Sequence, residues 1–117
     1  MVTSVRHVEC IDIDGGAKLR FVLTDFGLRV TADGNEVDIA DLLPYSDIFK
    51  RKGIIYEVIH SRIDLSDYTD VAKRCLWQYD EENNTTYVLC MPKSTVERQR
   101  ILYVLFNVRS KQLNFLV

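Results

Sequence analysis

Residues 18–31 constrain the fold most, because two runs of alternating apolar and polar side chains flank a glycine-bearing turn. Side chains alternate across a strand, so each run puts its apolar members on one face. Residues 18–24 and 28–31 therefore read as two strands of a hairpin that turns at Phe26-Gly27. The apolar members of the pattern are Leu19, Phe21, Leu23, Leu28 and Val30.

Most of the remaining chain up to residue 91 is also rich in β-branched and aromatic residues, which favour strands. We expect further strands at residues 5–13, 36–39, 54–65, 75–79 and 85–91, the last two forming a hairpin around a polar turn. Residues 40–44 are expected to form a helical turn and residues 50–53 a basic, exposed loop. Residues 64–70 are ambiguous: the strand continues with a bend, or Ser66 caps a short helix that runs to Cys75.

The last segment changes its period from that of a strand to that of a helix. Ser94 and Glu97 have the spacing of a capping box, in which each side chain bonds the backbone amide of the other residue. Ile101, Leu105 and Val108 then recur at helical spacing. The sequence predicts a helix over residues 94–110, with a strand as the alternative because residues 101–106 are almost all apolar.

This order of strands followed by one capped helix resembles the pleckstrin-homology-like (PH-like) superfamily. Residues 18–25 resemble the second strand of that family, residues 27–30 the third, residues 62–71 a middle strand, and residues 86–98 the last strand running into the closing helix. The resemblance implies one domain over residues 1–117, mainly β, in which a C-terminal helix caps an antiparallel β-barrel or sandwich. We expect this helix to plug one open end of the barrel.

Charge and cysteine content exclude several classes of protein. The formal net charge of the 117 residues is −2, which does not favour nucleic acid as a partner. No signal peptide and no membrane-spanning run is expected. Cys10, Cys75 and Cys90 are odd in number and far apart, so we expect three thiols, no disulfide framework and no zinc site. Thiols of this kind indicate a cytoplasmic protein, with the nucleus as an alternative.

Two groups of basic residues are candidates for binding phosphate or an acidic partner. The PH-like resemblance implies that a basic-x-basic pair on the second strand, here Lys18 and Arg20, grips the phosphates of an inositol lipid. The second group is the basic run Lys50, Arg51 and Lys52. Asp12 and Asp14 lie near the first pair in sequence and would repel a polyphosphate, so a solvated strand face is the alternative reading.

No pattern of residues supports catalysis, a metal or a cofactor. His7 and His60 each lack a Cys or Asp at ligand spacing. Asp64, Asp67 and Asp70 lack the glycine and terminal glutamate of a calcium-binding loop, and turn or cap chemistry explains them. We therefore expect a protein that is not an enzyme.

Apolar residues of the final segment outnumber those that one buried stripe uses. A partner protein, or a second copy of the chain in a homodimer, is expected to contact this surplus. Docking of a peptide or domain on the helix and the neighbouring strand edge is the predicted function, as an adaptor without chemistry. The candidate contact residues are Tyr103, Val104, Phe106, Leu113 and Phe115.

Two other functions stay open. One is a phosphoinositide-binding, membrane-targeting domain that uses Lys18, Arg20 and the basic run at residues 50–52. The other is a fragment of a DNA sliding-clamp-like subunit, because residues 19–31 and 55–75 resemble half of such a subunit. A helix rather than a strand at residues 66–75 would favour the clamp.

Overall fold

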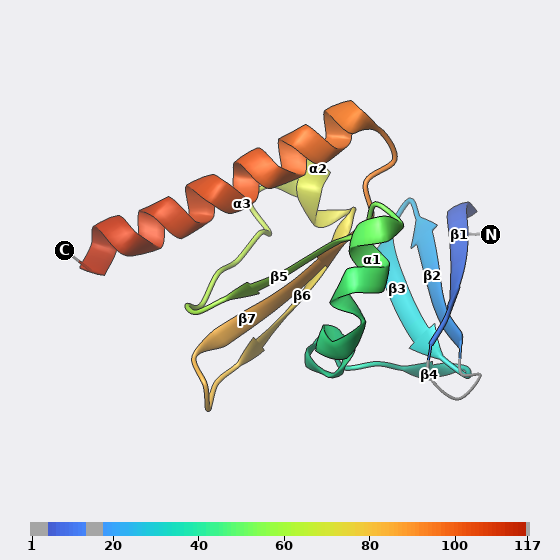
Figure 1. Ribbon diagram of the computed structural model, residues 1–117. Coiled ribbons are helices and arrows are strands. Elements are labelled where there is room, and N and C mark those ends of the chain that lie inside the picture. The colour runs from blue at the N-terminus through green and yellow to red at the C-terminus, as the bar shows by residue number, and fades with distance from the viewer. Residues whose placement is uncertain (1–4, 14–17, 117) are drawn as a thin grey trace.

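Two antiparallel sheets and a long C-terminal helix make up the computed structural model (Figure 1). It describes residues 5–13 and 18–116, and the side chains of residues 8–13 and 18–111. The N-terminal sheet has the order β1-β2-β3-β4, with β1 (Val5–Asp12), β2 (Lys18–Thr24), β3 (Gly27–Ala32) and β4 (Asn35–Glu36). The C-terminal sheet has the order β5-β7-β6, with β5 (Ile55–Ile59), β6 (Cys75–Asp80) and β7 (Thr85–Cys90). The helices are the 3-10 helix η2 (Ile39–Tyr45), α1 (Ser46–Arg51), α2 (Thr69–Ala72) and α3 (Thr95–Leu116).

The hairpin expected at residues 18–31 is confirmed as β2 and β3. Their register places Phe21 opposite Val30 and Leu23 opposite Leu28, and all four side chains are buried. Gly27 turns the chain with a φ of 137°, a conformation that side chains other than hydrogen rarely allow. The alternation in the sequence therefore gave the right strands and the right inward face.

Residues 36–53 agree with the expectation only in part: the helical turn expected at residues 40–44 is present as η2, but the strand at 36–39 and the loop at 50–53 are not. Only Asn35–Glu36 pairs as a strand, and η2 leads directly into α1. The prediction that the basic run forms a loop is wrong, because Lys50 and Arg51 form the last turn of α1 and Lys52 follows as its cap. Phe49 explains the difference: its ring is fully buried against Phe21, with 5.7 Å between ring centroids, and it fixes this segment to the sheet.

Residues 54–75 contain less strand than predicted. β5 ends at Ile59, and the chain beyond it runs as a loop whose Ile63 N–H donates to the Thr86 hydroxyl at 3.3 Å. The same hydroxyl donates to the Ser61 carbonyl at 2.7 Å. The Thr86 side chain on β7 therefore bonds the backbone of this loop, in place of the strand-to-strand backbone bonds that end with β5. The ambiguous segment after it forms a single helical turn, α2.

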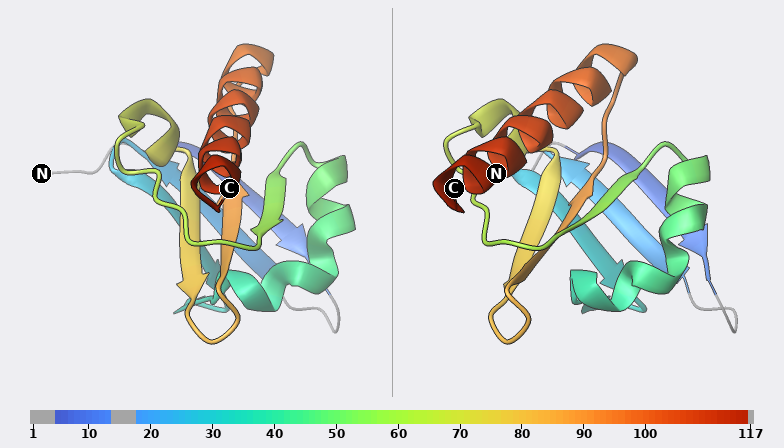
Figure 2. Two further views of the ribbon diagram at one scale, coloured as in Figure 1. Left: turned by 90° about the vertical axis from the view of Figure 1, so that its left-hand side faces the viewer. Right: turned by 60° about the vertical axis from the view of Figure 1, so that its left-hand side comes forward.

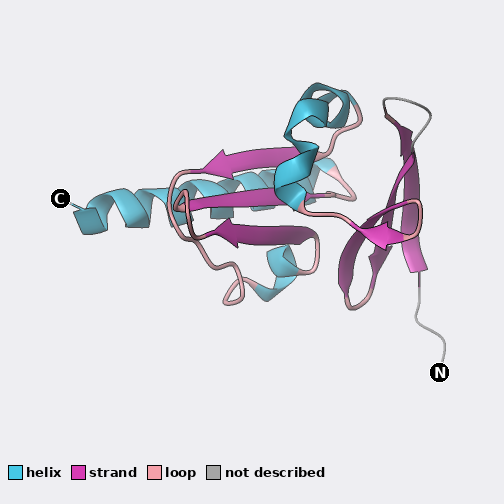
Figure 3. Ribbon diagram, turned by 90° about the horizontal axis from the view of Figure 1, so that it is seen from below, coloured by secondary structure: helices cyan, strands magenta, loops and turns pink. Residues whose placement is uncertain are grey.

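The middle strand of the C-terminal sheet, β7, is buried on both faces, which divides the interior into two cores. Val88 and Cys90 of β7 belong to the core under α3, whereas Leu89 and the following Met91 belong to the core shared with the N-terminal sheet. The strands of the two sheets cross at a steep angle (Figure 3). The described residues thus form two separate sheets and a helix in three layers.

The α3 helix begins as predicted, with one change in its cap. The Glu97 N–H donates to the Ser94 hydroxyl at 3.1 Å, but the Glu97 carboxylate accepts from the Lys93 N–H rather than from that of Ser94. Figure 2 shows α3 lying across the C-terminal sheet. Its buried residues Ile101, Leu105 and Val108 contact that sheet face, which differs from the expected plug in the open end of a barrel.

The cysteines also differ from the expectation. Cys75 and Cys90 are opposite each other on β6 and β7 and form a disulfide, and Cys10 is free and exposed. The expectation of three thiols is wrong because the sequence separation of 15 hides a cross-strand contact. Disulfides persist mainly in oxidising compartments, so the cysteines no longer support a cytoplasmic location.

Leu105→Asp is expected to abolish folding. Leu105 is 3% exposed in the core under α3, and an unpaired carboxylate there costs about 4 kcal/mol or more of the free energy of unfolding. Thermal unfolding followed by circular dichroism measures the effect. Leu102→Asp, on the same helix but 40% exposed, is the control and should keep a cooperative transition. A cooperative transition of Leu105→Asp near the wild-type temperature would contradict the packing of α3.

Maleimide labelling tests the disulfide. The unfolded but unreduced protein should take up one maleimide, on Cys10, because Cys75 and Cys90 are bonded to each other. After reduction, all three cysteines of the chain should react, as counted by mass spectrometry. Three adducts without reductant would show that the strands carry thiols.

Candidate functional site

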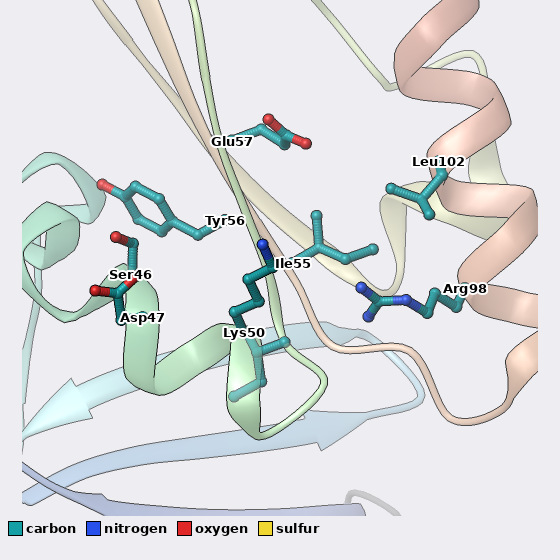
Figure 4. Close-up of a pocket in the computed structure, with 9 residues that line it drawn as sticks. Ser46, Asp47, Lys50, Ile55, Tyr56, Glu57, Arg98 and Leu102 are labelled. Carbon is teal, nitrogen blue, oxygen red and sulfur yellow. The ribbon is translucent and has the colours of Figure 1, made fainter.

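A groove runs along β5, which is an edge strand of the C-terminal sheet. The groove lies between α1 and α3 and has a volume of about 380 Å³ (Figure 4). Both helices and the strand contribute side chains to it. These include Asp47, Lys50, Ile55, Tyr56, Arg98 and Leu102.

The backbone of β5 presents hydrogen-bonding groups to this groove. The Met91 N–H donates to the Arg74 carbonyl on the β6 side, so alternation along β7 directs the backbone of Val88 and Cys90 toward β5. In the register of the two strands, Ile55 pairs with Cys90, Glu57 with Val88 and Ile59 with Thr86. The backbone groups of Tyr56 and Val58 consequently point away from β7. The Val58 carbonyl accepts a bond from Arg109 at 3.3 Å, in agreement with this direction.

Two cations face the groove from opposite walls. Lys50 extends from α1 and Arg98 from α3, and both point toward Ile55 (Figure 4). Arg98 is held in this position because its Nη1 donates to the Gly53 carbonyl at 3.0 Å. Further along β5, Glu57 forms an ion pair with Arg109 at 3.2 Å. The groove therefore offers charges of both signs and backbone groups for binding.

Tyr56 anchors η2 to the C-terminal sheet. Its hydroxyl donates to the Ile39 carbonyl at 2.6 Å, and the Ile39 N–H donates to the Gln78 side chain at 2.7 Å. Burial, with smaller contributions from Tyr87 and Asp41, raises the pKa of Tyr56 to about 12. Tyr56 is therefore protonated at neutral pH and serves as a hydrogen-bond donor.

The two predicted basic groups are not brought together. Lys18 and Arg20 are exposed on the outer face of β2, opposite the face on which Phe21 meets Phe49. The basic run lies on the inner side with α1, where Lys52 approaches Glu9 at 3.9 Å. The register also places Asp12 opposite Lys18, so a carboxylate accompanies the first group. No common phosphate site forms from these residues.

The predicted contact residues of α3 divide into three groups. Tyr103 and Phe106 are exposed, at 61% and 67%. Val104 is fully buried, so its expected exposure is wrong; it points with Ile101 into the core under the helix. The side chains of Leu113 and Phe115 lie outside the described residues. The prediction missed Val96, which is 76% exposed, although its helical spacing to Tyr103 was visible in the sequence.

Two of the three aspartates predicted to serve turns or caps, Asp64 and Asp70, have structural partners. The Asp64 carboxylate accepts the Ser66 N–H at 2.9 Å, and this bond lowers the pKa of Asp64. The Asp70 carboxylate accepts from Arg100 at 3.1 Å, which lowers the pKa of Asp70. Among the described residues, no group of three His, Cys, Asp or Glu side chains is arranged to hold a metal ion.

No family model matches the chain, and neither a search of curated proteins nor a search of solved structures found a match. None of the helices in the described part combines the length and the apolar character needed to cross a membrane.

Tyr56→Phe should destabilise the protein in a pH-dependent way. Loss of the hydroxyl leaves the Ile39 carbonyl without its donor, which costs about 1–3 kcal/mol of the free energy of unfolding. Because the folded-state pKa of Tyr56 is raised, its contribution is complete below about pH 10 and is lost as the pH rises through about 12. The difference between wild type and variant, measured by urea unfolding at pH 8 and near pH 12, should therefore shrink. Tyr103→Phe is the exposed control, and a difference that does not change with pH would contradict the assignment.

Proposed function

We propose that this protein is a non-catalytic interaction module, an adaptor of PH-like fold, that holds an extended segment of a partner protein along the edge of β5 and against α3. One observation carries the proposal: at the outer edge of β5 the backbone groups of Tyr56 and the Val58 N–H point away from their own sheet, whereas the Val58 carbonyl is already bonded to Arg109. A partner strand satisfies such groups with main-chain hydrogen bonds, and the side chains of the groove then select its sequence.

The walls of the groove suit a bound strand. Leu102 of α3 is 40% exposed and offers an apolar contact beside the edge. Lys50 and Arg98 supply cations on either side of Ile55, so an acidic side chain of the segment finds partners there.

The PH-like part of the proposal is supported by the order of elements. Four strands form one sheet, three form a second, and a capped helix follows the last strand. Three of the four segments on which the resemblance rests correspond to β2, β3 and the passage from β7 into α3. The fourth, residues 62–71, was expected as a middle strand but forms a loop and the helical turn α2. The proposal of a PH-like fold includes closure of these two sheets into a barrel.

Capture of partners from a cell extract tests the function. Proteins retained by the immobilised chain should be lost, by about tenfold or more, with Leu102→Glu in the groove wall. Leu43→Glu is the matched control, because Leu43 is 47% exposed on η2 and lies outside the groove. On addition of the captured protein, the backbone amides of Tyr56 and Val58 should become protected from hydrogen exchange. Equal retention by the two variants, or unchanged exchange at β5, would refute the proposal.

Phosphoinositide binding is the first alternative function, and it needs cations from both groups of basic residues. Pelleting with phosphoinositide-containing vesicles, lost on combined Lys18→Glu and Arg20→Glu substitution, would favour it. The clamp-like alternative draws on α2, the single helical turn at Thr69–Ala72. Ring-shaped assembly on DNA would favour the clamp. A cytoplasmic location is likewise a proposal, and the disulfide between Cys75 and Cys90 counts against it.

A further inference from the structure

The α3 helix carries apolar side chains on two opposite faces. One face is buried on the C-terminal sheet through Ile101, Val104, Leu105 and Val108. The other face points to solvent and exposes Val96, Tyr103 and Phe106 at 76%, 61% and 67%. A surface helix of a globular protein normally carries one apolar face, so the second face indicates a second contact.

The residues along this second face, exposed at the first four positions and half-buried at Ser110, follow a regular spacing. Positions 96, 99, 103, 106 and 110 are separated alternately by three and four residues, which is the spacing of a coiled-coil seam. Val96, Tyr103 and Phe106 are the apolar members, and Gln99 and Ser110 are the polar ones. A narrow stripe of this kind fits a partner helix better than a membrane surface, which needs a broad apolar face. We call these five positions the outer stripe of α3.

The charged side chains that α3 itself carries are mostly cations. Between Thr95 and Lys111 the helix has four cations and one carboxylate, and that carboxylate, Glu97, is paired with Arg74 at 2.9 Å. Arg100 and Arg109 reach Asp70 and Glu57 but remain 45% and 40% exposed, so further carboxylates can approach them. The four cations are Arg98, Arg100, Arg109 and Lys111. Because Arg98 points into the β5 groove, Arg100, Arg109 and Lys111 are the cations that flank the outer stripe.

This charge pattern disfavours pairing of the outer stripe with itself. A second copy would bring a helix with the same four cations against the first, and like charges repel across such an interface. A partner helix with an apolar seam and acidic flanking residues would instead pack its seam on the outer stripe and pair its carboxylates with the cations. The α3 helix has 22 residues, about 33 Å or three heptads, and it projects beyond the sheet, which leaves its length open to a partner (Figures 1 and 3).

We propose that the outer stripe of α3 binds an acidic amphipathic helix of a partner protein, packed side by side with α3. Tyr103 and Phe106 form the centre of the contact, and the cations on both flanks select a partner rich in Glu and Asp. This site extends the proposed interaction function to a second face of α3, and it does not require the β5 groove to be occupied.

A designed peptide tests the proposal. The probe is a labelled three-heptad helix with Leu at the seam positions and Glu at the flanking positions; its matched partner has Lys in place of each Glu. We expect the acidic peptide to bind about tenfold or more tightly than the basic one, and to bind more weakly as the salt concentration rises. Fluorescence anisotropy measures both effects on the whole chain.

The same substitution at two exposed phenylalanines provides the control. Phe106→Glu should weaken binding of the acidic peptide by about tenfold or more, whereas Phe26→Glu should not, because Phe26 is 81% exposed on the turn between β2 and β3. Circular dichroism checks that both variants fold. Equal partner capture by Leu102→Glu and Leu43→Glu, together with preferential binding of the acidic peptide, would mean that the groove proposal fails while the outer-stripe proposal stands.

Three outcomes would overturn the proposal. The first is no binding of the acidic peptide, or equal binding of the two peptides or of the two phenylalanine variants. The second is a dimer in light scattering that Phe106→Glu dissociates, because a second copy would then cover the stripe. The third is pelleting with anionic vesicles that Phe106→Glu abolishes, which would assign the stripe to a membrane surface.

Discussion

Burial of β7 on both faces is the constraint on which the rest of the structure depends. β7 is the middle strand of its sheet, with β5 on one side and β6 on the other. Val88 and Cys90 point toward α3, and Leu89 and Met91 point toward the N-terminal sheet. A strand in this position must be apolar at successive residues, which explains why residues 87–91 show no polar alternation.

The elements around β7 follow from this arrangement. The β6 strand is tied to it by the Cys75–Cys90 disulfide, and the loop after β5 is tied to it by the Thr86 hydroxyl. On the other face, Tyr56 and Gln78 hold both backbone groups of Ile39, which fixes the start of η2 and so the path into α1. The groove beside β5 exists because α1 and α3 lie on its two sides.

Local signals in the sequence were sufficient for the hairpins and for the start of α3. The β2–β3 hairpin depends on alternation and one glycine, and the helix start depends on Ser94 and Glu97, all within a few residues of each other. Features that depend on distant contacts were missed. The basic residues 50–52 end a helix because Phe49 is buried against β2, and the cysteines meet because β6 and β7 pair in one particular register.

The candidate site was foreseen in kind but not in detail. Excess apolar residues predicted an exposed face on the helix, and Tyr103 and Phe106 lie there, but the phase of the helix against the sheet buries Val104. The groove itself could not be predicted, because Lys50 and Arg98 are 48 positions apart and meet only through the packing of two helices around one strand.

An open strand edge also carries a hazard, since it is a template on which other chains can stack into extended aggregates. Here α1 and α3 lie on either side of β5. Charged residues line this edge: Lys50 on α1, Glu57 on β5 and Arg98 on α3. A single extended segment fits between the two helices, whereas the edge strand of another folded sheet would bring the rest of its sheet against them. The architecture thus allows entry of one strand while it discourages indefinite growth of the sheet.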